Sequence, residues 1–343
     1  MDYLIGSKKE FLDFVDSIKA EDKIGILTHT DLDGLASAVF LEKILEAKGH
    51  EVTFLDFLFY EDGVLEKVIS NLKENLIDKI FISDFSIDSL DDVAFNLLKE
   101  EFDVFLIDHH PLVGGFDYGN KVIKTASSDC SALTIFDLGK EIFDSENWEW
   151  LVCAAIFSDY SYKSSENFEF MKSVYPDLTL ENISYSKPGI IAKKVSSALI
   201  YYKRDLKKVY DLVLEKNLSE LDEIHEIIDE EINKCVEEYF DKAEFYPDKN
   251  MFIYEVDSKF SIASYVTTMV STMKKDFTFI SYQGGGEYYK ISARNQNVTQ
   301  DMNKLMKKGV EGLEHASGGG HAPASAARIM REDLGKFKGN ILK

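Results

Sequence analysis

Cysteine is scarce in this 343-residue sequence, and none of its three cysteines forms a CxxC pair. Cys130, Cys153 and Cys235 are odd in number and widely spaced, which argues against a disulfide framework and against a zinc–thiolate site. Long apolar runs are also missing, because none approaches the roughly 20 residues of a membrane span. The amino terminus lacks the basic start and continuous apolar core of a signal peptide. These absences predict a cytoplasmic protein without a membrane segment.

Basic residues are outnumbered by acidic ones, 39 against 61, which gives a net charge of −22. A protein that holds long nucleic acid neutralises many phosphates with lysine and arginine. The composition therefore favours a small anionic substrate, met by a few local cations, over a long duplex. The hydrophobic content of 45% is ordinary for a globular protein, and the length is sufficient for two cores.

The first half of the sequence alternates short β-branched or aromatic runs with helical patterns. This alternation predicts a doubly wound α/β domain with a parallel sheet. The first 15 residues predict a short amphipathic helix. Strands are predicted at Lys23–Thr28, Glu51–Phe57, Lys79–Ser83, Asp103–Ile107 and Lys121–Lys124, and helices at Leu35–Ala47, Ser131–Phe143 and Trp148–Phe157.

The second half changes character. Helical spacing dominates from about Lys193 to Lys242, and mixed elements follow. Strands are predicted at Met251–Val256, Phe277–Tyr282 and Tyr288–Ala293, the last two joined as a hairpin by a glycine-rich turn, with a helix at Ile262–Met273. We therefore predict an amino-terminal domain over residues 1–190, a helical linker over 191–244, and a smaller α/β domain over 245–343.

Acidic and histidine side chains follow the ends of the predicted strands. They are His29-Thr-Asp31-Leu-Asp33-Gly34 after the first strand, Asp84 after the third, Asp108-His109-His110 after the fourth, and Asp159 after the apolar run Leu151–Phe157. The carboxyl ends of parallel strands face one crevice, so we expect these side chains to converge.

Aspartate and histidine without thiolate suit manganese, magnesium or iron better than structural zinc. Two such cations about 3.5–4 Å apart activate water and stabilise a phosphate, whereas the same carboxylates without cations would repel one another. Each fragment alone has a simpler interpretation: Asp31–Gly34 as a turn or helix cap, Asp84 as a loop cap, His109–His110 as a surface pair. Their combination favours a two-metal phosphoesterase.

These segments resemble the four motifs of the DHH phosphoesterase superfamily, and Ser317-Gly-Gly-Gly-His321 resembles the GGGH motif of the DHH-associated substrate-binding domain. The resemblance implies one metal on His29 and Asp31, a second on Asp33, His109 and Asp159, and Asp84 as the bridge between them. It implies catalytic roles for Asp108, His110 and Arg294, and substrate contacts by Arg294, Gly318, Gly319, Gly320 and His321. Tyr160 departs from the small residue or threonine usual after the last motif, but no ligand is lost.

We therefore expect a manganese-dependent hydrolase, with Mg²⁺ or Fe²⁺ as alternative metals, acting on short RNA or DNA oligonucleotides or on small nucleotides such as pAp or a cyclic dinucleotide. A RecJ-type exonuclease is an alternative, because the spacing of the first motif is RecJ-like. A pyrophosphatase or polyphosphatase and a non-catalytic replication scaffold are further alternatives. The oligomeric state is left open between monomer and homodimer.

Overall fold

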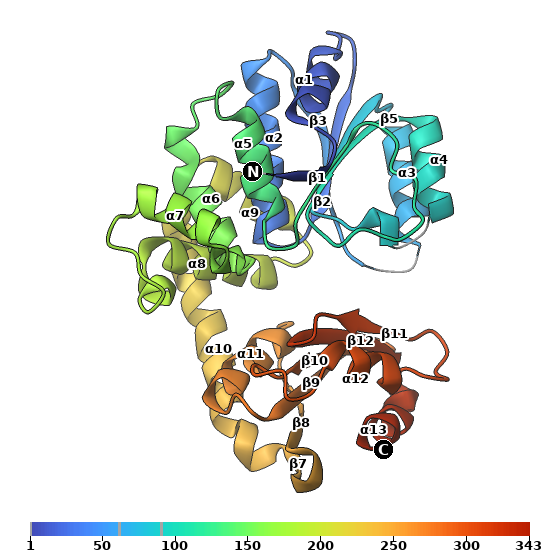
Figure 1. Cartoon of the computed structure of the whole chain (residues 1–343), viewed down its shortest axis with the longest axis vertical. Coiled ribbons are helices and arrows are strands. Elements are labelled where there is room, and N and C mark those ends of the chain that lie inside the picture. Colours follow the sequence, from blue (N-terminus) through green and yellow to red (C-terminus); the bar gives the residue numbers. More distant parts are fainter. Residues whose placement is uncertain (1, 61–62, 90–91) are drawn as a thin grey trace. The chain divides into compact units, whose positions relative to one another are not determined.

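Two six-stranded sheets organise the chain in a computed structural model that describes residues 2–60, 63–89 and 92–343. Each sheet belongs to its own compact unit, formed by residues 1–222 and 223–343 (Figure 1). Among the helices described, none combines the length and the apolar composition that a bilayer span needs. All three cysteines are free and buried.

The sheet of the first unit has the strand order β1-β6-β5-β4-β2-β3. Its strands are β1 (Tyr3–Ile5), β2 (Ile24–His29), β3 (Val52–Leu58), β4 (Lys79–Ser83), β5 (Asp103–Asp108) and β6 (Val122–Thr125). All neighbouring strands pair in parallel except β1, which lies antiparallel to β6. The predicted doubly wound α/β architecture is confirmed, and every predicted strand of this unit lies within two residues of its observed bounds.

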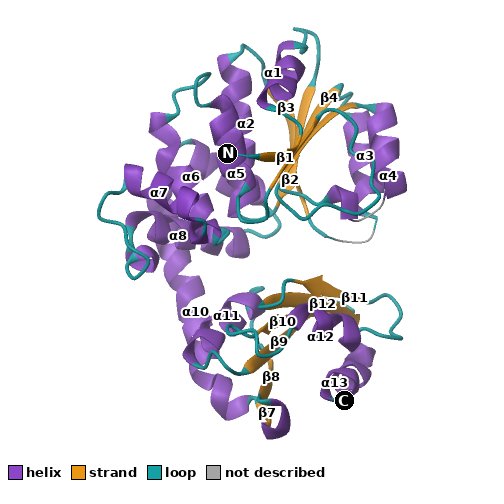
Figure 2. Cartoon of the chain, in the orientation of Figure 1, coloured by secondary structure: helices purple, strands orange, loops and turns teal. Residues whose placement is uncertain are grey.

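Helices cover both faces of this sheet (Figure 2). The helices of the unit are α1 (Lys8–Asp16), α2 (Leu32–Ala47), α3 (Val64–Glu74), α4 (Asp92–Glu101), α5 (Ser131–Gly139), α6 (Glu149–Ser158), α7 (Ser165–Val174), α8 (Lys187–Tyr201) and α9 (Leu206–Leu214). Helix α9 and all but the first turn of α8 lie in the stretch predicted as a linker.

The prediction of one helix over the first 15 residues is wrong in part. Tyr3–Ile5 forms the edge strand β1, and the helix begins only after Ser7. Gly6 separates the two elements with φ of +79°, a backbone conformation that favours glycine, and a Cβ there would lie 1.9 Å from the carbonyl oxygen of Val122. Ser7 then caps the helix, accepting a hydrogen bond from the Glu10 amide.

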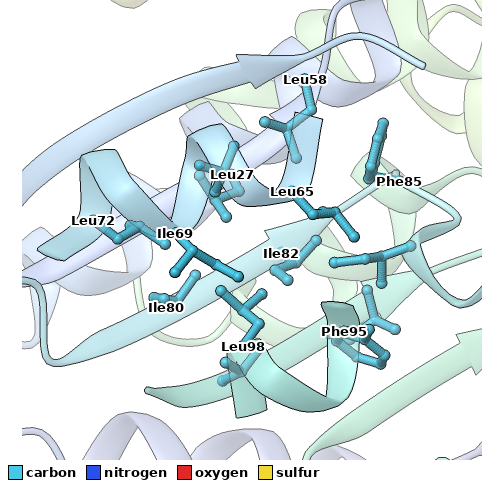
Figure 3. Close-up of a cluster of buried hydrophobic side chains, with 14 of the residues drawn as sticks. Leu27, Leu58, Leu65, Ile69, Leu72, Ile80, Ile82, Phe85, Phe95 and Leu98 are labelled. Atoms are coloured by element: carbon cyan, nitrogen blue, oxygen red, sulfur yellow. The ribbon is translucent and has the colours of Figure 1, made fainter. Parts of the chain in front are cut away.

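One core lies between this sheet and helices α3 and α4 (Figure 3). Ile80 and Ile82 of β4 point to this side, while Phe81 points to the other side and packs edge-on against Phe11 and Phe14 of α1. Because successive strand residues face opposite sides, the continuous apolar run of β4 is buried on both. The polar residues that follow such strands are thereby held at a rigid edge.

The second unit contains α10 (Leu221–Lys242), which begins at the end of the first unit. Its strands are β7 (Glu244–Tyr246), β8 (Met251–Glu255), β9 (Thr278–Gly285), β10 (Tyr288–Arg294), β11 (Ser317–Gly320) and β12 (Ala324–Met330), in the order β11-β12-β10-β9-β8-β7. Its other helices are α11 (Ala263–Met273), α12 (Met302–Gly309) and α13 (Leu334–Leu342). Strands β9 and β10 form the predicted hairpin, and the smaller α/β unit is confirmed.

The core of the first unit generates a stability prediction. Leu98 of α4 is fully buried in the cluster of Figure 3, whereas its neighbour Leu97 is 42% exposed. Leu98→Ala should lower the free energy of unfolding by about 2–5 kcal/mol through lost burial and a residual cavity. Leu97→Ala removes the same atoms from a wetter position and should cost less than about 1 kcal/mol. Urea unfolding followed by circular dichroism measures both, and equal losses would contradict the packing described.

Candidate metal centre

The first motif places its side chains at the junction of β2 and α2. His29 ends β2, and Asp31 caps α2 by accepting a hydrogen bond from the Gly34 amide at 3.0 Å. Nδ1 of His29 lies 2.9 Å from Oδ2 of Asp31. A Cβ on Gly34 would lie 2.3 Å from the carbonyl oxygen of His29. Glycine is therefore required for the helix to start this close to the strand.

Asp33 lies in the first turn of α2 and is almost fully buried. Its two carboxylate oxygens accept hydrogen bonds of 2.8 Å from the backbone amides of Ser131 and Ala132, at the start of α5. The positive end of that helix dipole stabilises a negative charge at this position. The α5 terminus thus fixes the orientation of the Asp33 carboxylate.

Asp84 follows β4 in a left-handed backbone conformation, with φ of +53°, which is uncommon outside glycine. Its amide donates to the carbonyl of Ile107 on the adjacent strand. Its Oδ1 lies 3.3 Å from Nε2 of His109, and its Oδ2 lies 3.7 Å from Nδ1 of His29. Asp84 therefore stands between the first and third motifs.

His109 joins Asp33 and Asp159 on the other side of Asp84. Its Nε2 lies 3.7 Å from Oδ2 of Asp33, and its Nδ1 lies 3.8 Å from Oδ2 of Asp159, which caps the carboxyl end of α6. Within each of three sets of side chains, one potential ligand atom per residue lies within 4.8 Å of the others. The sets are His29, Asp31 and Asp84; Asp33, His109 and Asp159; and Asp84, His109 and His110.

Mutual repulsion and burial shift the titration of this cluster. Burial raises the pKa of Asp84 well above its ordinary value, and the nearby Asp33 and Asp31 raise it further. Burial also raises the pKa of Asp159 to about 9, with Asp33 and Asp84 adding to the shift and His109 opposing it. Burial lowers the pKa of His109, but the charges of Asp159 and Asp33 outweigh this effect and raise it overall. The cluster therefore gathers more carboxylates in a low-dielectric environment than can all be ionised together without cations.

Two buried polar atoms in the cluster have no hydrogen-bond partner among the residues described, Oδ2 of Asp84 and Nδ1 of His109. Such groups are costly to leave unsatisfied, and carboxylate oxygens with imidazole nitrogens are a donor set that divalent cations accept. The residues present therefore fit divalent cations, and the six predicted ligands are brought together by the fold.

A buried lysine organises the residues behind His110. Nδ1 of His110 lies 2.8 Å from Oδ1 of Asp108, and Nζ of Lys124 donates to Oδ2 of Asp108 at 2.6 Å. Lys124 also lies 3.0 Å from Oδ2 of Asp88, which accepts a 2.6 Å hydrogen bond from the Tyr118 hydroxyl. The side chains of Lys124, Asp88 and Asp108 are all completely buried.

This network keeps Asp108 ionised and orients the His110 ring. Burial would raise the pKa of Asp108, but the hydrogen bond from His110 and the charge of Lys124 lower it below its ordinary value. An ionised carboxylate only accepts hydrogen bonds, so Nδ1 of His110 carries the proton. Sequence reasoning missed Lys124 and Asp88; the available signal was a lysine inside the otherwise apolar β6.

The predicted substrate residues lie in the second unit. The guanidinium of Arg294, at the end of β10, donates to hydroxyls of Ser264 and Thr268 on α11 and to the backbone carbonyl of Ser325. Gly318, Gly319 and Gly320 are part of strand β11. A Cβ on Gly318 would lie 2.8 Å from the carbonyl oxygen of Met306, so the absence of a side chain here leaves room for α12. His321 follows β11 and is exposed.

Residues 23–156, which carry every predicted ligand except Asp159, match the DHH family, N-terminal domain. The match covers less than half of the chain, so it is a similarity of this segment to that domain family. No curated protein matches the chain at a significant level.

The similarity to solved structures extends beyond residues 23–156. An exonuclease RecJ bound to manganese is 15% identical with a TM-score of 0.73, covering 98% of this chain and 94% of that one. RecJ from Thermus thermophilus with Mn²⁺ is 14% identical with a TM-score of 0.75, covering 97% of this chain and 53% of that one. An exopolyphosphatase-related protein from Bacteroides fragilis is 15% identical with a TM-score of 0.55, covering 98% and 95%. At these identities the likeness shows a shared fold.

The ion-pair network around Lys124 generates a stability prediction. Lys124→Met would leave Asp108 and Asp88 buried without their cation, and should lower the free energy of unfolding by about 3–5 kcal/mol. The double variant Lys124→Met/Asp88→Asn should recover part of this loss. Lys79→Met is the comparison, since its partner Asp103 is one-third exposed and water can solvate the carboxylate left behind. An equal or larger loss for Lys79→Met in urea unfolding would contradict the account.

The raised pKa values in the first unit predict how pH affects the metal-free protein. Asp159 titrates near 9 when folded and near 3.9 when unfolded, so the stability that its protonated form contributes is complete at low pH and is lost as pH rises towards 9. Asp84 and His109 act in the same direction. With EDTA, Tm should therefore fall between about pH 5 and pH 9.

Manganese should reverse this trend, because protons and cations compete for the same ligands. Asp159→Asn should flatten the metal-free slope, whereas Asp177→Asn, at an exposed position, should leave it unchanged. A metal-free Tm that is constant or rises with pH would contradict the charge arrangement described.

Proposed function

We propose that this protein is a two-metal phosphoesterase that hydrolyses phosphodiester or phosphomonoester bonds of short oligonucleotides or small nucleotides. The observation that carries the proposal is the pair of ligand sets flanking Asp84, one containing His29 and Asp31, the other His109 with Asp33 and Asp159. A single buried carboxylate with contacts to both sets is the arrangement that two adjacent cations require.

In this proposal His29 and Asp31 hold one cation, Asp33, His109 and Asp159 hold the other, and Asp84 is shared. Manganese is the proposed metal, because oxygen and imidazole ligands without thiolate suit it. When bound, the two cations would lower the pKa of a water molecule and neutralise charge on the phosphate. The α5 amides orient the Asp33 carboxylate before any cation binds.

His110 is proposed to act on the substrate rather than on the metals alone. Asp108 holds its Nδ1–H, and Lys124 holds Asp108, so the imidazole is fixed in orientation and tautomer before the substrate arrives. In the neutral ring the other nitrogen would accept a proton from the attacking water, and in the protonated ring it would donate to a phosphate oxygen or to the leaving group. Arg294, Gly318–Gly320 and His321 are proposed to bind the substrate in the second unit.

A RecJ-type exonuclease is the second candidate. It is favoured by the likeness to RecJ structures, which in one case covers 94% of the RecJ chain. A non-catalytic scaffold is disfavoured by the presence of all six carboxylate and imidazole ligands, since a chain that had lost metal binding would have no need of this repulsive cluster.

Hydrolysis of a substrate panel by the purified protein with manganese tests the proposal. The panel comprises a dinucleotide, a pentanucleotide RNA, pAp, a cyclic dinucleotide, a long single-stranded DNA and pyrophosphate. We expect turnover of the short phosphodiesters, and we expect Asp84→Ala to reduce it by more than about 100-fold, beyond the loss typical of an outer-sphere change. Asp177→Ala, which removes an exposed carboxylate of the same unit, should retain activity.

Two outcomes would decide against the preferred substrate. Faster turnover of the long strand than of the short species would identify the RecJ-type activity. Absence of turnover across the panel, together with no manganese-dependent rise in Tm, would identify the scaffold.

A further inference from the structure

Two aromatic side chains lie beside His29 at the carboxyl edge of the first sheet. In that sheet β2, which ends at His29, pairs with β3 on one side and with β4 on the other. Tyr60 comes two residues after the end of β3, and Phe85 comes directly after Asp84 at the end of β4. Each neighbour of β2 thus brings one aromatic residue to the end of that strand.

The rings of Tyr60 and Phe85 form a stacked pair. Their centroids are 4.5 Å apart, and their planes are inclined by 19°. Phe85 is fully buried and belongs to the apolar cluster of Figure 3. The hydroxyl oxygen of Tyr60 accepts a hydrogen bond of 3.0 Å from the backbone amide of Ser86. The Tyr60 ring is held at one face and at its hydroxyl, so little side-chain entropy remains to be lost when a ligand binds.

Part of the Tyr60 ring remains accessible despite these contacts. The residue is 40% exposed. Because Phe85 covers one face of the ring, the exposed surface lies on the other face and on the edges. The ring centroid of Tyr60 is 5.3 Å from that of His29, which the proposed function assigns to a cation. An accessible, oriented aromatic surface therefore borders the candidate metal centre on the side of His29.

The charge of the first unit limits how it can bind a nucleoside. Residues 1–222 contain 42 acidic and 23 basic side chains. Bound cations would hold the phosphate of a substrate, but they do not contact the nucleoside attached to it. A nucleobase stacks on an aromatic ring without needing a charge, and every base has a face that can do so. An aromatic ring beside the metal centre supplies that interaction in an acidic unit.

We propose that Tyr60 is a specificity-determining residue that stacks with a nucleobase of the substrate, while Phe85 and the Ser86 amide hold its ring in place. The ligand is a nucleotide or short oligonucleotide whose scissile phosphate lies at the candidate metal centre. This role rests on the proposed function, because it adds a base subsite to the same enzyme. It favours phosphoesters of nucleosides over phosphate compounds without a base, such as pyrophosphate.

Kinetics on matched dinucleotides test the role of Tyr60. The substrates are the dinucleotide ApA and two analogues in which one or the other nucleotide is abasic, each hydrolysed by the full-length chain with manganese. Tyr60→Leu should lower kcat/KM for ApA about 10-fold, the loss expected for one base stack. On the analogue that lacks the stacked base, the same variant should lower kcat/KM less than about twofold, because the two changes remove one interaction. Equal losses on all three substrates would overturn the proposal.

Two further variants separate the ring from the hydroxyl and from exposed tyrosines in general. Tyr60→Phe keeps the ring and should retain most of the activity on ApA. Tyr185→Leu is the matched control, since Tyr185 is 81% exposed in the same unit and its ring centroid lies 5.3 Å from Nζ of Lys193. It should leave all three rates unchanged. A loss in Tyr60→Phe as large as that in Tyr60→Leu would assign the effect to the hydroxyl and overturn the stacking role.

Binding without turnover distinguishes failure of this role from failure of the proposed function. The probe is a dinucleotide with a methylenephosphonate linkage, which resists hydrolysis, and with 2-aminopurine placed in turn at either position. The fluorescence of this base falls when it stacks, so we expect quenching by the wild type and by Tyr60→Phe, and loss of quenching in Tyr60→Leu.

Three outcomes remain to be told apart. Turnover of ApA by the wild type, with equal quenching by the wild type and Tyr60→Leu, would overturn the stacking role alone. Quenching that depends on the Tyr60 ring, without turnover of any phosphoester, would overturn the proposed function and support the base subsite. Absence of both turnover and quenching would overturn both proposals.

Discussion

Repulsion among carboxylates gathered at one edge of the first sheet is the constraint on which the rest of this structure depends. The carboxylates of Asp33, Asp84 and Asp159 all lie close to the imidazole of His109. Because they are buried, water does not screen the repulsion between them. The fold compensates some of these charges with nearby donor groups. Asp33 receives two backbone amides, and Asp108, one residue before His109, receives a buried ammonium. Asp84 retains an unsatisfied oxygen, in the middle of the cluster.

The carboxylates differ in how completely the protein satisfies their hydrogen bonds, and this difference distinguishes structural residues from candidate metal ligands. The carboxylates of Asp108 and Asp88 are fully satisfied by protein groups, so they can be buried permanently and serve to hold other residues. Asp84 is held in place by a left-handed backbone rather than by partners for both of its oxygens. A strained backbone conformation persists only where the surrounding structure holds it in place. Strands β5 and β2, which pair with β4 on its two sides, hold the backbone of Asp84.

The sequence was sufficient to predict the parallel sheet and the convergence of the six predicted ligands, because both follow from apolar strands with polar residues at their carboxyl ends. It was not sufficient for the first edge strand, where Tyr3–Ile5 is too short to show periodicity and takes its partner from residues far along the chain. Lys124 was missed for a related reason. A lysine in a strand is ordinarily an edge or surface residue, and only the tertiary fold places Asp88 and Asp108 around it.

The overall charge of the chain illustrates the limit of compositional reasoning about partners. A value of −22 averages two units of different charge, one that carries most of the excess acidic side chains together with the candidate cation sites, and one that is nearly balanced. In the first unit, part of the acidity is offset whenever divalent cations are bound, so the formal charge overstates the repulsion that a substrate meets. In the second, the strand register gathers cations that lie 38 residues apart, Lys290 and Arg328, onto one side of a sheet. The substrate that the chain accepts is governed by these local fields, since screening confines each to about 10 Å at moderate ionic strength.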